Sequence, residues 1–174
     1  MNHNSFPTEL DNLAANLLEA LRGSGDRLVL AESCTGGLIA TAITRQPGAS
    51  QVFAGSAVVY QEATKSAWLG IAPDFIDSHG VVSREVAQAM ARGVLSSTPH
   101  ATVALAVTGH LGPNAPAGQD GVIFIGTGST DGQTAERYEC RSLPQDDPLQ
   151  LRRDRQIEVA AAVLRRARST LVLP

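Results

Sequence analysis

Residues 28–40 read LVLAESCTGGLIA: an apolar run leads through a turn of small residues into a helix-forming run. The apolar residues predict a strand over 27–31, and the residues after the two glycines predict a helix over 38–44. A strand that feeds a helix is the repeating unit of α/β folds, in which ligands bind where strands end beside helix N-termini. The turn also carries two potential nucleophiles, Ser33 and Cys34. The stretch therefore sets the fold class and indicates chemistry at one end of the strand.

The alternation of strands and helices continues along the chain. Further strands are predicted at residues 52–60, 102–107, 122–126 and 133–140, with a turn at 129–132. Further helices are predicted from Thr8 to the glycines at 23 and 25, over 61–69, from Ser83 through Val94, and over about 149–171, whereas Pro73 and Gly80 are assigned to a loop. The pattern predicts a three-layer α/β/α sandwich with a mostly parallel sheet and antiparallel strands at one side. Strand 102–107 is apolar throughout, so we expect it at the centre.

Composition narrows the function classes. The 174 residues contain 43% hydrophobic and 18% charged residues, which fits one domain over 1–174 with a flexible tail at 1–7. A net charge of −3 without a basic half argues against nucleic acid as a partner. No apolar run approaches the roughly 20 residues needed to cross a bilayer, and no signal pattern opens the chain, so we expect a cytoplasmic protein without a membrane partner. Two cysteines without metal spacing predict neither a disulfide framework nor a metal site, and no cofactor is expected.

The turn after the first strand has features of an anion-binding site. The first N–H groups of a helix lack internal partners, so those around Thr35, Gly36 and Gly37 are candidates to hold an anion or a developing oxyanion. The glycines would let a ligand approach the backbone closely. The spacing matches neither G-x-G-x-x-G nor the phosphate loop of nucleotide triphosphatases.

Two other strand ends carry candidate groups. Tyr60 ends the second strand and Lys65 follows in the next helix; a buried lysine with a lowered pKa can take the proton of a serine hydroxyl. The alternative is that Lys65 is a solvated helix residue and Tyr60 a core ring. Thr108, Gly109 and His110 leave the third strand, and His110 is a candidate lining residue whose titration would shape a pH profile. In a parallel sheet these strand ends share one edge.

Taken together, these stretches resemble the CinA C-terminal domain family, the nicotinamide-nucleotide amidases. The resemblance is carried, in order, by AESCTGG (31–37), VVYQEATKSAWLGI (58–71), HGVVSREVAQAMARG (79–93) and AVTGHLGP (106–113). It implies a stand-alone amidohydrolase domain that converts nicotinamide mononucleotide to nicotinate mononucleotide and ammonia. Its partner would be this small-molecule nucleotide, and a homo-oligomer is expected. The resemblance gives Ser33 the role of nucleophile, Tyr60 and Lys65 its activation, and Thr108 substrate binding.

The chain departs from the family pattern at two places. The loop NAPAGQDG (114–121) is shorter than usual and lacks a family Lys-Pro, and the last helix lacks the usual Gly-Asp-Arg. The resemblance implies an arginine contact to substrate or phosphate near the start of that helix, for which Arg153 and Arg155 are candidates and Arg152 stays open. Two alternatives to the amidase remain: an altered or inactive member that binds a nucleotide, and an accessory protein connected with competence or DNA damage. Cys34 is the rival nucleophile, because a thiol at a helix N-terminus can have a lowered pKa.

Overall fold

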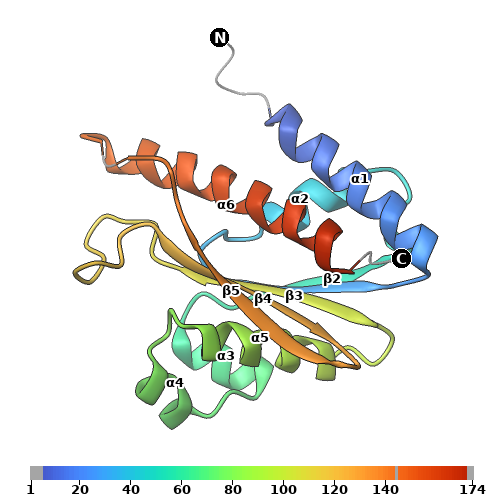
Figure 1. The fold of residues 1–174 in the computed structure, drawn as a ribbon, viewed down its shortest axis with the longest axis horizontal. Coiled ribbons are helices and arrows are strands. Elements are labelled where there is room, and N and C mark those ends of the chain that lie inside the picture. Colours follow the sequence, from blue (N-terminus) through green and yellow to red (C-terminus); the bar gives the residue numbers. More distant parts are fainter. Residues whose placement is uncertain (1–5, 144, 172–174) are drawn as a thin grey trace.

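The computed structural model describes residues 6–143 and 145–171 (Figure 1). Its centre is a five-stranded sheet in the order β2-β1-β3-β4-β5. The strands are β1 (Leu28–Glu32), β2 (Phe53–Val58), β3 (Val103–Gly109), β4 (Val122–Ser129) and β5 (Gly132–Glu139). β1 pairs in parallel with β2 and β3, whereas β3–β4 and β4–β5 are antiparallel. The predicted fold class is confirmed, and β3, the strand predicted to be central, is the middle strand.

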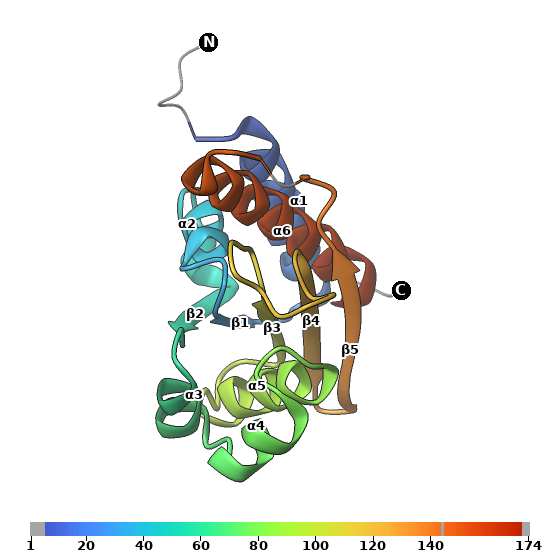
Figure 2. The same ribbon diagram turned by 90° about the vertical axis from the view of Figure 1, so that its left-hand side faces the viewer.

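Helices cover both faces of the sheet (Figure 2). One layer contains α1 (Thr8–Ser24), α2 (Leu38–Thr44) and α6 (Pro148–Leu171), and the other contains α3 (Glu62–Leu69), α4 (Pro73–His79) and α5 (Arg84–Ser96). A single 3₁₀ turn, Ala49–Gln51, precedes β2. As predicted, the side chain of Ser83 caps α5 by accepting a hydrogen bond from the Val86 N–H.

The assignment of Pro73 to a loop was wrong, because Pro73 is the first residue of α4, whereas Gly80 lies outside the helix. Proline is favoured in the first turn of a helix, where its missing N–H has no helical partner, so Pro73 begins α4 rather than breaking it. Buried Ile76 attaches this short helix to the core, and Gly80 follows its last residue.

The core consists of two clusters, one on each face, because successive side chains of a strand point to opposite faces. Leu28 and Leu30 of β1 face α1, α2 and α6, whereas Val29 and Ala31 face α5. On the α5 side the sheet carries small residues: a Cβ at Gly126 would lie 2.2 Å from the carbonyl oxygen of Ala87. Glycine there lets α5 pack directly onto the sheet.

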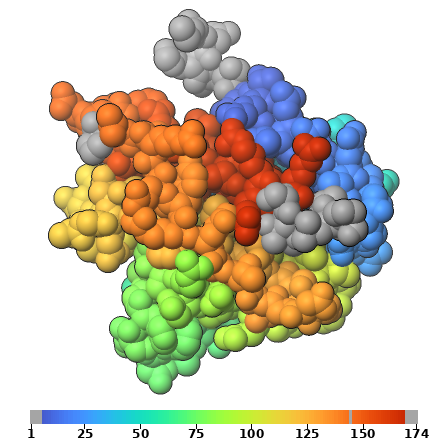
Figure 3. Space-filling model, in the orientation of Figure 1, coloured from blue at the N-terminus to red at the C-terminus, as the bar shows by residue number. Residues whose placement is uncertain are grey.

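Three parts of the chain border the carboxyl ends of the parallel strands. In the space-filling view the loop over 110–121 protrudes from the body, with the start of α6 above it and α4 below (Figure 3). The tail expected at 1–7 lies mostly outside the described residues, but Phe6 is described, and the guanidinium of Arg45 lies 4.4 Å from its ring centroid.

Candidate active site

Ser33 and Lys65 meet at the end of β1, as the sequence predicted. Ser33 follows the last residue of β1, and its N–H donates to the carbonyl oxygen of Val107 in β3. Lys65 lies in α3, and its Nζ is 3.0 Å from Ser33 Oγ. The Lys65 side chain is fully buried, and Ser33 is 7% exposed. The interpretation of Lys65 as a solvated helix residue is therefore wrong.

The surroundings of Lys65 favour a neutral amine. Burial lowers the pKa of Lys65 from its ordinary 10.5, because the charged form loses water. Nζ also lies 2.9 Å from the carbonyl oxygen of Val59 and 3.3 Å from that of Tyr60. The charged form donates from Nζ to all three oxygens. Once the amine has lost a proton, its two N–H groups serve the carbonyls and its lone pair is free for the hydroxyl proton of Ser33. The arrangement can therefore remove that proton.

Lys65 is the only lysine among the 174 residues, and every other Lys or Arg position is an arginine. A guanidinium stays protonated in proteins, whereas an amine can lose its proton when buried. The single lysine amine of the chain thus lies against Ser33, the candidate nucleophile.

Tyr60 contacts the pair through its backbone rather than its ring. Its side chain is 59% exposed, so it is not a core ring. Its hydroxyl accepts a hydrogen bond from Arg152 at 3.0 Å, and among the described residues it makes no hydrogen bond to Ser33 or Lys65. The carbonyl oxygen of Tyr60, together with that of Val59, orients Lys65. A role for the hydroxyl in catalysis stays a prediction.

Glu32 occupies the helix terminus that the sequence assigned to a ligand. Its fully buried carboxylate accepts hydrogen bonds from the hydroxyls of Thr35 (2.7 Å) and Ser56 (3.2 Å). It also accepts from the first N–H groups of α2, those of Gly37, Ile39 and Ala40. A carboxylate at a helix N-terminus satisfies free donors and interacts favourably with the helix dipole. These donors are thus used by the protein itself.

The predicted oxyanion donors therefore need correction. The N–H of Gly37 donates to Glu32, and that of Gly36 donates to the Ser33 carbonyl oxygen. Both glycines have left-handed backbones, with φ of 61° and 93°, and this conformation explains why glycine stands at both positions without any need for a ligand. The N–H groups of Cys34 and Thr35 make no hydrogen bond to another residue in the described ranges. The N–H of the residue that follows the nucleophile is an oxyanion donor in α/β-hydrolases.

A small cavity of about 190 Å³ opens beside Ser33 and Lys65. Its wall contains the predicted residues Thr108, Gly109 and His110 together with Arg152, and no aspartate or glutamate lines it. The predicted binding residues Thr35, Gly36 and Gly37 are not part of the wall, and neither are Arg153 and Arg155. The remaining lining residues are Cys34, Tyr60, Val81, Val82, Leu111, Gly112, Pro113, Asn114 and Ala115.

Two of the predicted wall residues also hold the framework. Thr108 Oγ1 donates to the carbonyl oxygen of Val81 at 2.9 Å, which leaves its oxygen lone pairs for a ligand. A Cβ at Gly109 would lie 2.1 Å from the side chain of Ile123, so glycine allows β3 and β4 to pair there. His110 is partly exposed, and its backbone N–H and carbonyl bond to Val122 and Gly121.

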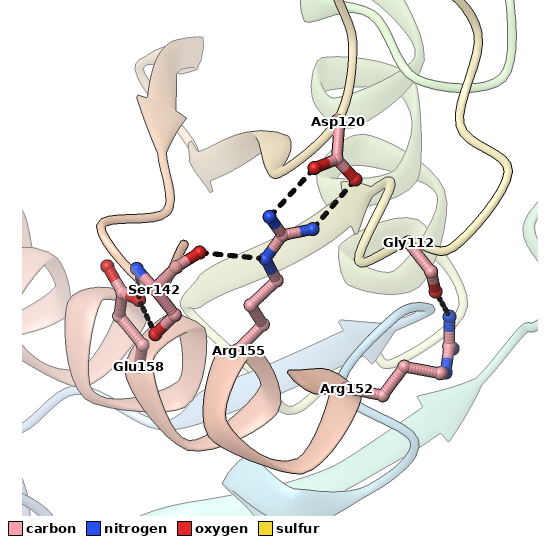
Figure 4. Close-up of polar contacts among 6 residues, drawn as sticks. All are labelled: Gly112, Asp120, Ser142, Arg152, Arg155 and Glu158. Carbon is pink, nitrogen blue, oxygen red and sulfur yellow. Dashed lines mark hydrogen bonds and ion pairs between the residues drawn. The ribbon is translucent and has the colours of Figure 1, made fainter. Parts of the chain in front are cut away.

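The three arginines at the start of α6 have different surroundings, and Figure 4 shows two of them, Arg152 and Arg155. Arg152 lines the cavity and donates to the carbonyl oxygen of Gly112 and to the hydroxyl of Tyr60. Arg153 is exposed, and Arg155 is buried in an ion pair with Asp120. Arg152, the residue that the sequence left open, is therefore the arginine in position to contact a ligand. Neither Arg153 nor Arg155 reaches the cavity.

Cys34 is a poor nucleophile in this setting. Burial is the main cause that raises the pKa of its thiol to about 12, so the thiolate does not form near neutral pH. The thiol belongs to the core cluster between the sheet and α1, α2 and α6. Cys140 is partly buried, and its pKa is also raised to about 12, mainly by burial.

Comparison with known proteins agrees with the motifs. A family model described as the CinA C-terminal domain matches residues 10–167. The chain belongs to the CinA C-terminal domain family. A CinA-like protein of Myxococcus xanthus is 50% identical over 117 residues, which cover 67% of this chain and 28% of the relative. A CinA-like protein of Mycobacterium tuberculosis is 38% identical over 162 residues, or 92% of this chain and 35% of the relative. The chain thus spans about a third or less of these curated relatives.

Solved structures of CinA-type proteins share the fold. The competence/damage-inducible protein CihA of Agrobacterium tumefaciens matches with a TM-score of 0.77 at 31% identity, covering 97% of each chain. A CinA superfamily protein of Klebsiella pneumoniae gives a TM-score of 0.83 at 22% identity over 93% of this chain and 97% of the other.

The described ranges contain neither a membrane-spanning helix nor a metal-binding cluster. No helix there has the length and apolar character needed to cross a membrane. No cluster of three or more histidine, cysteine, aspartate or glutamate side chains is arranged to hold a metal ion there.

Proposed function

We propose that this CinA-family chain is an amidohydrolase that converts nicotinamide mononucleotide to nicotinate mononucleotide and ammonia. The observation that carries the proposal is the 3.0 Å contact between Ser33 Oγ and the buried amine of Lys65. A hydroxyl held against a buried amine whose pKa is lowered, beside a cavity, is the arrangement that nucleophilic attack on an amide needs. The family resemblance supplies the substrate.

In the proposed reaction, Lys65 accepts the hydroxyl proton of Ser33 as Oγ attacks the carboxamide carbon. The carbonyl oxygen becomes an oxyanion, for which the N–H groups of Cys34 and Thr35 are the candidate donors. As the intermediate collapses, the C–N bond breaks and Lys65 returns the proton to the leaving nitrogen, which departs as ammonia. A water molecule then attacks the ester on Ser33, again giving a proton to Lys65. Release of the acid returns this proton to Ser33 Oγ.

The cavity supports a substrate that enters ring first. About 190 Å³ is less than the roughly 300–1,000 Å³ of common ligand pockets, so it suits the pyridine ring with its amide. The ribose and phosphate would then lie at the mouth, where Arg152 provides a planar cation suited to a phosphate. The absence of acidic residues from the lining also favours an anionic ligand.

Ammonia release from nicotinamide mononucleotide tests the proposal. Ser33→Ala is expected to abolish the release, because the acyl-enzyme cannot form. Ser96→Ala is the matched control: Ser96 is exposed at the end of α5, outside the cavity lining, and its loss should leave the rate unchanged. Full activity of Ser33→Ala would refute the proposal.

The same assay separates the alternatives. Tight nucleotide binding by the wild type without ammonia would support the interpretation as a nucleotide-binding member, to which the shortened 114–121 loop points. If the wild type neither binds the nucleotide nor releases ammonia, the result would support the interpretation as an accessory protein. That role is suggested by the competence/damage-inducible name of the Agrobacterium protein.

A further inference from the structure

The loop over 110–121 forms one side of the cavity. It contributes the six consecutive residues from His110 to Ala115 to the lining. The base of the loop is closed by backbone hydrogen bonds from the His110 N–H to Val122 and from the Gly121 N–H to His110, each 2.9 Å long. Between these points the loop has little bulk, and there its other backbone hydrogen bonds in the described chain run from the Gln119 N–H to Pro116 and from the Val122 N–H to Gln119. Its lining segment therefore depends on contacts with α6.

Asp120 and Arg155 form the strongest of these contacts. Two guanidinium nitrogens of Arg155 each donate to a separate carboxylate oxygen of Asp120 at 2.8 Å, and Nε donates to the carbonyl oxygen of Ser142 at 3.2 Å (Figure 4). The Arg155 side chain is 3% exposed and that of Asp120 is 43% exposed. A buried arginine on a rigid helix thus holds an aspartate that belongs to the loop. Bidentate pairs of this kind fix orientation as well as distance.

The ion pair lies directly against the lining segment. A Cβ at Gly112 would be 2.8 Å from an Asp120 carboxylate oxygen and 3.0 Å from Arg155 Nη1. On the same residue, Arg152 donates to the carbonyl oxygen of Gly112. Arg152 and Arg155 lie about one helical turn apart on α6, so the helix holds Gly112 at two points.

We propose that Asp120 and Arg155 are positioning residues that fix the cavity-lining loop, and that Arg155 acts through this loop rather than on a ligand. Neither residue is part of the cavity lining, whereas Gly112, which packs against both, is. Asp120 also lies in the loop that departs from the family pattern, in the QDG segment that lacks the family Lys-Pro. The effect on turnover rests on the proposed amidase function; the effect on loop order does not.

Asp120→Asn tests the proposal by keeping the shape of the side chain and removing its charge. Hydrogen exchange of the amides in 110–121, followed by mass spectrometry, is expected to accelerate about tenfold or more, because the loop loses its ion pair with α6 and keeps only the contact of Gly112 with Arg152. In the ammonia assay the KM for nicotinamide mononucleotide is expected to rise about five- to twentyfold with kcat within about twofold, since Ser33 and Lys65 belong to other elements. Asp120→Glu, which retains the carboxylate, should recover most of both properties.

Two further variants separate loop positioning from general stability. Asp120→Asn alone leaves the buried guanidinium of Arg155 without its carboxylate, so Asp120→Asn with Arg155→Met removes both charges. This double variant should melt close to the wild type but keep the fast loop exchange and the raised KM. Asp131→Asn is the matched control, because Asp131 is exposed in the turn between β4 and β5, at the opposite end of β4 from the loop.

Unchanged loop exchange in Asp120→Asn would overturn the proposal, as would an acceleration spread evenly over the whole chain. The proposal would also be overturned if the double variant regained the wild-type melting temperature and, with it, the wild-type rate of loop exchange and the wild-type KM. If the wild type releases no ammonia, the amidase function fails, and the exchange measurements still decide whether the pair holds the loop.

Discussion

Replacing Lys65 with methionine removes the amine and keeps an unbranched side chain of similar length in a fully buried position. A positioned general base contributes about 10²–10⁴-fold to a rate, so kcat/KM in the ammonia assay should fall by about that factor. This corresponds to about 3–5 kcal/mol of transition-state stabilisation. No other side chain is placed to act as the base in Lys65→Met, because among the described residues no other basic side chain lies within hydrogen-bonding distance of Ser33 Oγ.

The lowered pKa of Lys65 gives this prediction its pH dependence. In the folded protein the amine becomes protonated below 10.5, whereas in the unfolded chain it does so near 10.5. The stability contributed by the neutral buried amine is therefore complete above 10.5. It falls by about 1.4 kcal/mol per pH unit as the pH drops toward the folded-state pKa, and it levels off below that value. Activity should follow the folded-state pKa, with kcat/KM rising with pH as the amine loses its proton.

Since Lys65 is the only lysine, labelling with ¹³C-lysine gives one side-chain signal, and its shift against pH reports the folded-state pKa directly. The same pKa should appear in the kcat/KM profile. Urea unfolding of wild type and Lys65→Met over a range of pH should give a stability difference that changes with pH in the sense described. A lysine signal that titrates near 10.5, or pH profiles of stability that run parallel in the two proteins, would refute the neutral-amine mechanism.

Three further predictions follow from other contacts. Glu32→Gln should lower the free energy of unfolding by about 2–4 kcal/mol in urea titrations, because an amide cannot accept from all the donors that the carboxylate satisfies; unchanged stability would contradict the capping role. Gly93→Ala should destabilise by about 1–3 kcal/mol, since its Cβ would lie 2.2 Å from the carbonyl oxygen of Leu69, whereas Gly23→Ala in α1, with nothing within 4 Å, should stabilise slightly; equal melting temperatures would refute this. Arg152→Ala should raise the KM for nicotinamide mononucleotide about tenfold or more, whereas the rate with free nicotinamide, assayed as a substrate without phosphate, should be the same as that of the wild type; an equal loss for both substrates would rule out a phosphate contact.

Most of the fold could be predicted because its signals are local. Apolar runs of β-type residues predicted the first four strands, and the turn at 129–132 predicted the more polar fifth strand after it. Helical spacing or capping residues predicted five of the six α-helices in the described chain. The missed helix, α4, has seven residues and one buried anchor, Ile76, so it has no apolar period to detect. Its start depends on Pro73, whose effect differs between the first turn of a helix and its interior.

The candidate site was predictable where it depended on strand ends. Ser33 and Lys65 were expected at one sheet edge, and they lie in contact there. The arginine was not predictable from spacing, because successive residues of α6 point about 100° apart and the sequence does not fix the rotation of the helix. Arg152 thus faces the cavity, and Arg155 faces Asp120.

The error at the anion site has a similar cause. The sequence shows that the first N–H groups of α2 need acceptors, and it also shows a carboxylate at Glu32 five residues before Gly37. Which acceptor reaches these donors depends on the path of the turn. The left-handed backbones of Gly36 and Gly37 bring the start of α2 back over the end of β1, so the internal carboxylate takes the place that an external anion was expected to fill.

The position of the Ser33–Lys65 pair follows from strand order and register together. β1 lies between β2 and β3, and the connection after β1 runs through α2 on one face, whereas the connection after β2 runs through α3, α4 and α5 on the other. Chain that leaves neighbouring strands toward opposite faces opens a crevice at their carboxyl ends, and Ser33 and Lys65 approach it from its two sides. The register shift between Leu28 and Val29 then aligns Glu32 with Val58. One residue of a strand advances the chain by about 3.3 Å. A register slip of one residue would therefore displace the chain after β2 by about as much as the 3.0 Å distance between Lys65 Nζ and Ser33 Oγ, and the two groups would lose contact. The irregularity at the start of β2 therefore matters for chemistry at its far end.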